Sequence, residues 1–293
     1  MLNREFRALF VAELPERRTA LLLSGGIDSA LALALLRAVG CEPVSITAGA
    51  LGAPDLEHAE RVARAFDTPW EPCVFAAEDV RERLPAIVPD FGAGGLLTVA
   101  SGLVLDRCFA RAAELGITHV WAGNGLDVLF GGGVPMQTIE VQAGHTFHER
   151  FWSYTLPLLE RREDPLNLYG VMGKRYGIRV SMPFETLAAA KIARRVDAAT
   201  LYRDGSDKAP VRTLAERLGV PAGLAARPKD ALQRSSGMFG ALRHVMIEDA
   251  SRLCPDPYQP VDDDHEDPYV ELRYFIALLS RAMTDRKRPG GFS

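Results

Sequence analysis

Short apolar runs alternate with amphipathic stretches along the first half of the chain. The apolar runs cover residues 19–23, 43–47, 70–75 and 118–122. The stretches with helical spacing cover residues 3–13, 28–40, 54–66, 78–88 and 96–115. Apolar strands that alternate with helices are typical of a parallel sheet with helices on both faces. The pattern therefore predicts an α/β fold.

The strand signal fades after about residue 150, and prolines then interrupt the helical spacing. We predict an α/β domain over residues 1–150 and a mainly helical domain over residues 151–254 that completes the active site. Residues 255–293 are predicted to form an acidic linker, a terminal helix and a disordered tail. The aromatic face of that helix packs either within the chain or on a second subunit, which leaves a homodimer open.

Charge and composition narrow the classes of partner. The chain has 34 basic and 38 acidic residues, a net charge of −4, so it has no general attraction to nucleic acid or to an anionic membrane. No stretch approaches the roughly 20 apolar residues of a membrane helix, and the N-terminus lacks a signal region. We therefore expect a soluble cytoplasmic protein. The four cysteines form no Cys-x-x-Cys pair, which disfavours a zinc site or a disulfide framework.

A glycine turn follows the first apolar run and opens a helix. Its sequence is Ser24-Gly25-Gly26-Ile27-Asp28-Ser29. The free N–H groups of a helix start suit a phosphate, and the two serines add hydroxyl donors. Asp28 would repel a phosphate unless a cation lies between them, so this carboxylate indicates Mg²⁺. The turn has neither the lysine of a Walker loop nor a GxGxxG pattern.

A second glycine turn, Gly123-Asn124-Gly125, ends the fourth apolar run. Ligands of parallel sheets sit at the carboxyl ends of the strands, so both turns are predicted to face one crevice. Thr47 ends the second run and is predicted to reach the same nucleotide. The predicted nucleotide-binding residues are Ser24, Gly25, Gly26, Asp28, Ser29, Thr47 and Gly123.

The first turn resembles the PP-loop of the N-type ATP pyrophosphatases, which cleave ATP to AMP and pyrophosphate. Residues 121–133, WAGNGLDVLFGGG, resemble a signature that asparagine synthetases and β-lactam synthetases share. The resemblance implies a Rossmann-like PP-loop domain that binds ATP and Mg²⁺. It also implies that Asp127 is the second carboxylate of the metal site, beside Asp28.

A third stretch, residues 208–237, resembles the downstream Lys-x-x-x-Arg and Arg-x-Lys region of the same family. This resemblance implies that Lys208 contacts pyrophosphate and that Lys229 lies near the same phosphates, both as catalytic residues. A lysine supplies a point charge where negative charge grows in the transition state.

Several residues depart from the family pattern. Full asparagine synthetases begin with a glutaminase domain whose nucleophile is a cysteine at position 2, where this chain has Leu2. The PP-loop begins at residue 24, so we expect no glutaminase domain and expect ammonia to be free or to come from a separate protein. The family glutamate of the second motif is Asn124, and the acid after Asp127 is Val128. The acceptor half of the site has changed, which favours a different small-molecule acceptor in specialised metabolism.

The leading hypothesis is a synthetase that adenylates a carboxylate or amide-like oxygen and then transfers an amine or ammonia. One alternative is a sulfur transferase that acts on a nucleobase-like small molecule or tRNA, with Cys108 as its thiol or with sulfur from a donor protein. Cys108 lies within an apolar helix, which favours a buried thiol over a reactive one. The other alternative is a module that binds adenine nucleotide without turnover.

Overall fold

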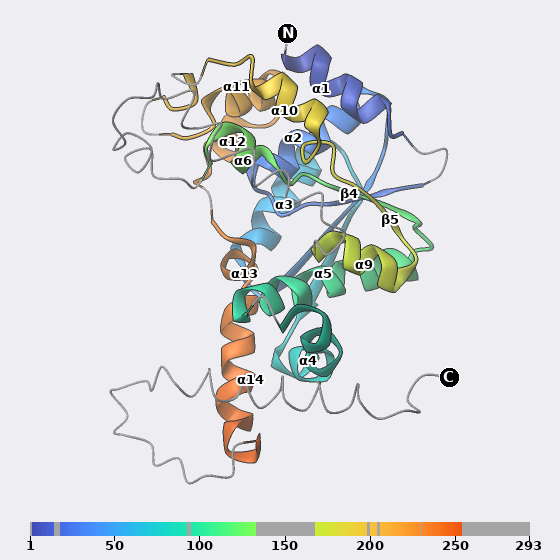
Figure 1. Ribbon diagram of the computed structural model, residues 1–293, viewed down its shortest axis with the longest axis vertical. Helices are drawn as coiled ribbons and strands as arrows, with labels where there is room; N and C mark the ends of the chain where they lie inside the picture. Colours follow the sequence, from blue (N-terminus) through green and yellow to red (C-terminus); the bar gives the residue numbers. More distant parts are fainter. Residues whose placement is uncertain are drawn as a thin grey trace.

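The computed structural model describes residues 2–14, 18–92, 95–132, 168–197, 200–203, 206–228 and 230–253. Its frame is a five-stranded sheet in the order β3-β2-β1-β4-β5, in which every pair is parallel (Figure 1). The strands are β1 (Ala20–Leu22), β2 (Val44–Ala50), β3 (Trp70–Phe75), β4 (His119–Ala122) and β5 (Arg179–Ser181). The predicted α/β fold, a Rossmann-like sheet followed by a helical region, is confirmed.

The helices of the first half are α1 (Leu2–Val11), α2 (Ile27–Ala38), α3 (Pro54–Ala65), α4 (Ala77–Phe91), α5 (Leu96–Glu114) and α6 (Leu126–Phe130). Those of the second half are α9 (Leu168–Tyr176), α10 (Leu187–Ala193), α11 (Ala209–Arg217), α12 (Ala222–Ala225), α13 (Leu232–Ser235) and α14 (Met238–Leu253). The domain boundaries predicted at residues 150 and 254 lie outside the described residues and stay predictions, as do the linker, helix and tail of residues 255–293.

Two hydrophobic cores cover the two faces of the sheet. On one face α1, α2, α3, α10, α11 and α12 pack on residues such as Leu21 and Trp121. On the other, α4, α5, α9 and α14 pack on residues such as Ala20, Ile46 and Val120. Neighbouring residues of a strand point to opposite faces, so a strand covered on both sides is apolar throughout. This explains the apolar runs at the central strands β1, β2 and β4, whereas the edge strand β3 is buried only at Cys73 and Phe75.

Strand β5 was not predicted, because the strand signal was taken to fade after residue 150. The strand has three residues, pairs only with β4 among the described strands, and carries an exposed Arg179, so it has no apolar run. A polar contact joins the two strands, since His119 Nε2 lies 2.7 Å from Ser181 Oγ. Burial of the imidazole, with the nearby Arg179, lowers the pKa of His119 to about 4.

The lengths of the helices bear on a membrane location. Within the described part of the chain, no single helix is long and apolar enough to cross a membrane. Helices α4 and α5 have the length and apolar composition of a membrane span only when they are taken together, and this pair is bent by 119°.

Candidate active site

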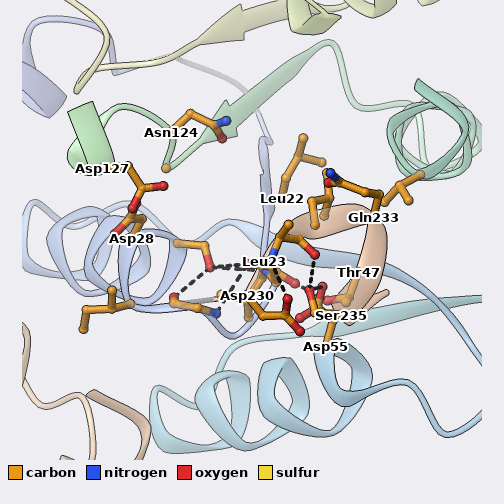
Figure 2. A pocket seen from close by; sticks show the side chains of 18 of the residues that line it. Leu22, Leu23, Asp28, Thr47, Asp55, Asn124, Asp127, Asp230, Gln233 and Ser235 are labelled. Atoms are coloured by element: carbon orange, nitrogen blue, oxygen red, sulfur yellow. Dashed lines mark hydrogen bonds between the residues drawn. The ribbon is translucent and has the colours of Figure 1, made fainter. Parts of the chain in front are cut away.

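A cavity of about 320 Å³ lies at the carboxyl ends of β1, β2 and β4 (Figure 2). The predicted residues that line it are Ser24, Gly26, Asp28, Ser29, Thr47, Cys108, Gly123, Asp127 and Lys208. Gly25 belongs to the same turn but is not among the lining residues, and Lys229 lies outside the described residues. The two glycine turns therefore share one crevice, as the strand order requires.

Gly25 fixes the course of the first turn. Its φ is +69°, a left-handed conformation that favours glycine. A Cβ at this position would lie 2.5 Å from the backbone nitrogen of Ala59 and 2.5 Å from the carbonyl carbon of His58. The turn thus packs directly on the backbone of α3, at a distance that no side chain permits.

The two serines brace the turn from within. Ser29 Oγ accepts a hydrogen bond from the Ser24 N–H at 3.2 Å and donates to the Gly26 carbonyl at 3.1 Å. Ser24 Oγ accepts from the Gly26 N–H at 3.3 Å. Gly26 is the N-cap residue of α2 and has no side chain with which to cap it. The first N–H groups of α2 are therefore suited to an anion in the cavity.

Lys208 joins the two aspartates that were predicted to hold a metal. Its Nζ donates to Asp28 Oδ1 at 2.6 Å and to Asp127 Oδ1 at 2.7 Å. The aspartates come from the first turns of α2 and α6 and point toward one another (Figure 2). Lys208 precedes α11, and its position in the resemblance assigned it to pyrophosphate. No pattern in the sequence indicated that Lys208 contacts both carboxylates.

The backbone and the packing at Lys208 are both unusual. Its φ of 52° is left-handed, a conformation that costs a non-glycine residue on the order of 1–3 kcal/mol. A Cβ at Gly132 would lie 2.7 Å from Lys208 Cε and 3.0 Å from its Cδ, and would also collide with Asp127 Oδ1. Because position 132 is a glycine, the Lys208 side chain has the space that it needs to reach the aspartates.

The aspartate pair fits a magnesium site. Two carboxylate oxygens that converge on one ammonium can also converge on one metal ion, which holds oxygen ligands at about 2.0–2.1 Å. Mg²⁺ is usually held by one or two carboxylates together with substrate phosphates, so two protein ligands suffice. No group of three or more His, Cys, Asp or Glu side chains suited to a metal occurs among the residues that the structure describes. The metal site implied by the family therefore needs phosphate oxygens to complete it.

A second buried ion pair lines the cavity away from Asp28, and the sequence did not reveal it. Arg227 donates to Asp55 Oδ1 at 2.9 Å and to the Ser24 carbonyl at 3.1 Å. Ser235 Oγ donates to Asp55 Oδ2 at 2.9 Å. Burial raises the pKa of Asp55, and the hydrogen bonds from Arg227 and Ser235 oppose that rise. The pair ties α3, the PP-loop and the segment before α13 together.

Thr47 and Cys108 line the cavity, but the hydrogen bonds of Thr47 and the burial of Cys108 limit the reactions in which they can take part. Thr47 Oγ1 donates to the Leu23 carbonyl at 2.5 Å and accepts from Trp70 Nε1 at 2.9 Å, so its proton is already committed. Cys108 is buried, and burial raises the pKa of its thiol well above the ordinary value. The same effect raises the pKa of Cys73 to about 11. A thiol of this kind is protonated at neutral pH and is a poor nucleophile.

The second glycine turn contacts the first. A Cβ at Gly123 would lie 2.8 Å from the Asp28 carbonyl oxygen and 2.8 Å from Ser29 Cα. Next to it, Asn124 Oδ1 accepts a hydrogen bond from the Tyr169 hydroxyl at 2.7 Å. Asn124 stands where the resembled signature has a glutamate, so this corner of the cavity has an amide in place of a carboxylate.

The chain is similar in sequence to known proteins. The family model described as asparagine synthase matches residues 15–176. The chain is 25% identical over 183 residues to "Putative asparagine synthetase (glutamine-hydrolyzing) 1" of Methanocaldococcus jannaschii, covering 60% of this chain and 32% of that protein. It is 27% identical over 214 residues to a 7-cyano-7-deazaguanine synthase of Azoarcus sp., covering 64% of this chain and 91% of that protein. The chain thus spans about a third of the first relative and most of the second.

Proposed function

We propose, from the premise that this chain belongs to the asparagine synthase family, that it is an AMP-forming synthetase that acts on a small molecule. It adenylates a carboxylate or amide-like oxygen of an acceptor and releases pyrophosphate. An amine or ammonia, free or delivered by a separate protein, then displaces AMP. The reaction takes place in the cytoplasm.

The observation that carries this proposal is the convergence of Asp28, Asp127 and Lys208 beside the start of α2. The N–H groups at that helix start bind phosphate oxygens and orient the chain of phosphates along the cavity. Asp28 and Asp127 would hold Mg²⁺, which when bound neutralises charge on the departing pyrophosphate. Lys208 stabilises the same charge as it develops.

The first step exchanges one bond at phosphorus for another. The acceptor oxygen forms a bond to the α-phosphorus while the bond from that phosphorus to the β-bridging oxygen breaks. The electron pair of the broken bond leaves with pyrophosphate. In the second step the amine nitrogen forms a bond to the activated carbon, AMP leaves with its oxygen, and a proton is lost from nitrogen.

Nitrogen is favoured over sulfur as the nucleophile by two observations. The names of both relatives describe products with a carbon–nitrogen group, an amide in asparagine and a nitrile in the cyano compound. Cys108, the thiol that sulfur transfer would use, is buried with a raised pKa. A module without turnover is disfavoured, because such a module has no need for two carboxylates and a lysine at the phosphate end.

The test is pyrophosphate release from ATP and Mg²⁺ with a panel of small carboxylates and amides, run separately with ammonium and with sulfide. We expect ammonium-dependent AMP formation with at least one acceptor. The variant Asp127→Asn should lose most of this release, whereas the exposed Glu216→Gln on α11 should retain it. Release that depends on sulfide alone would overturn the nitrogen assignment, and release retained in Asp127→Asn would overturn the role of that carboxylate.

A further inference from the structure

We propose that Lys208 is a built-in substitute for the metal. Its ammonium holds the two carboxylates in the nucleotide-free chain, and a divalent ion enters only when nucleotide phosphates draw the lysine away. This inference rests on the proposed function, because it concerns the same aspartates, Asp28 and Asp127. It adds that nucleotide is needed for the metal ion to bind tightly.

The contact distances identify one cation position. The ammonium lies 2.6 Å from one carboxylate oxygen and 2.7 Å from the other, so it occupies the point on which both oxygens converge. A metal ion bound by the same two oxygens would lie beside the ammonium, which repels it. The lysine in this position therefore opposes binding of the metal.

Lys208 is more deeply buried than the two carboxylates that it contacts. The Lys208 side chain is 2% exposed, whereas those of Asp28 and Asp127 are 19% and 22% exposed. The lysine stem passes Gly132, and Lys208 lines the cavity together with both carboxylates. A metal–nucleotide complex in the cavity therefore reaches the carboxylates, while Lys208 stays close to the phosphates.

Charge explains why the exchange needs nucleotide. Two carboxylates and one ammonium leave the cluster with a single negative charge, which attracts a divalent ion weakly. A divalent ion bound by the same oxygens would repel the ammonium. The phosphates of ATP offer the displaced ammonium anionic partners, so nucleotide and metal favour each other's binding. The displaced Lys208 then lies against the phosphates that leave.

Removing the ammonium should therefore expose a metal site that the wild-type chain conceals. Lys208→Met has a side chain of similar length without the charge, so it can still occupy the channel beside Gly132. The matched control is Lys191→Met, which removes the same charge from an exposed position on α10. Asp28→Asn combined with Lys208→Met removes one ligand from the exposed site.

The experiment measures Mn²⁺, a spectroscopic substitute for Mg²⁺, by the paramagnetic resonance signal of the free ion, first without nucleotide. We expect weak binding by the wild-type chain and by Lys191→Met. Lys208→Met should bind Mn²⁺ at least about tenfold more tightly than the wild-type chain, which is a typical size for coupled binding equilibria. The double variant should lose that gain. Equal affinity in the wild-type chain and Lys208→Met would overturn the inference.

A second measurement uses only the wild-type chain, in case Lys208→Met does not fold. Mn²⁺ binding should tighten at least about tenfold when a non-hydrolysable ATP analogue is present, beyond what the analogue binds by itself in solution. Tight Mn²⁺ binding by the wild-type chain without nucleotide would overturn the inference. Either negative result, in a chain that still releases pyrophosphate, would leave the proposed function standing. Metal binding that is unmasked in Lys208→Met, together with a wild-type chain that releases no pyrophosphate with any acceptor, would reject the function alone.

Discussion

A lysine ammonium as deeply buried as that of Lys208 is stable only because Asp28 and Asp127 share its charge. The cluster of Lys208 with the two aspartates adds little to the free energy of unfolding, since replacing a buried ion cluster by apolar residues is often neutral or stabilising. The left-handed backbone of Lys208 at the start of α11, and the contact of its ammonium with Asp28 at the start of α2, instead suit a residue retained for chemistry.

Lys208→Ala should therefore slow turnover more than it weakens nucleotide binding. The lysine strengthens its interaction as charge develops on pyrophosphate, and such an interaction appears mainly in kcat. We expect a loss of at least about tenfold in kcat, or ~1.4 kcal/mol of barrier. Single-turnover kinetics and binding of a non-hydrolysable analogue separate the two effects. Equal losses in affinity and in kcat/KM at unchanged kcat would contradict this role.

Gly132→Ala tests the channel through which Lys208 passes. The added methyl group would collide with Lys208 Cε and Cδ, so we expect a destabilisation of about 1–3 kcal/mol and a marked loss of turnover. The matched control is Gly223→Ala in α12, where an added Cβ meets nothing within 4 Å. Denaturant unfolding and pyrophosphate release measure the two effects. A Gly132→Ala chain that is as stable and active as Gly223→Ala would show that the lysine does not need this space.

The residues of the site differ in how far the sequence could reveal them. Asp28 and Asp127 stand in local motifs, and the resemblance of those motifs to a known family was enough to group them. The pairing of Asp55 with Arg227 joins residues 172 positions apart in the sequence, and neither residue lies in a pattern that points to the other. Long-range pairs of this kind are set by the packing of whole elements, which no local pattern records.

At the scale of elements, Arg227 connects three parts of the cavity wall. It bonds Asp55 on α3 and the Ser24 carbonyl of the PP-loop, and its own carbonyl accepts from Arg212 at 3.0 Å. The backbone N–H of Ala50 also donates to the Ser236 carbonyl at 2.8 Å, so β2 is tied to the segment after α13. The cavity wall is thus formed by residues from both halves of the chain.

Arg227→Ala should loosen the PP-loop and weaken binding of a non-hydrolysable ATP analogue by about tenfold or more, since hydrogen bonds of charged groups contribute roughly 1.5–3 kcal/mol. Arg227→Lys keeps the charge but not the fork that reaches two acceptors, so its effect should be intermediate. Calorimetry measures the affinity. The exposed Arg217→Ala on α11 is the control, and an Arg227→Ala chain with that control's affinity would contradict a positioning role.

The contact between β4 and β5 predicts a dependence of stability on pH. His119 has a pKa of about 4 when folded, against an ordinary value of 6.5. Between these values the unfolded chain binds a proton that the folded chain does not, so stability falls as pH falls from about 6.5 to about 4, by at most about 3 kcal/mol. Unfolding by urea at several pH values measures this slope.

The variant His119→Phe should flatten the slope in that window. It removes the titrating group while an aromatic ring still packs on Trp121, whose centroid lies 4.9 Å from that of His119. His244→Gln, at an exposed position of α14, should leave the slope as it is in the wild-type chain. A slope that persists in His119→Phe would mean that other groups set the acid stability.

The sequence predicted elements well where burial is continuous and poorly where it is not. The strands β1, β2 and β4 lie between two cores and are apolar enough to be read directly, whereas β3, at one edge of the sheet, buries only Cys73 and Phe75. Strand β5 lies at the edge and is three residues long, so its pairing with β4, not its composition, makes it a strand.

At the scale of the whole molecule, the site depends on both halves of the chain. Asp28 and Asp127 lie within the matched residues 15–176, whereas Lys208 and Arg227 lie beyond them. The part of the chain that the family model matches therefore supplies the two carboxylates proposed to hold Mg²⁺, and the part beyond it supplies Lys208 and Arg227. On the proposed function, a different acceptor is most readily accommodated in that second part, while the phosphate end stays the same.

The central claim is that ATP is cleaved between its α and β phosphates in this cavity. The most direct test is phosphorus NMR of ATP incubated with the chain, Mg²⁺, ammonium and the acceptor found by pyrophosphate release. The account predicts AMP and pyrophosphate in equal amounts, formed at a rate that falls at least about tenfold in Lys208→Ala. Accumulation of ADP and orthophosphate would contradict it.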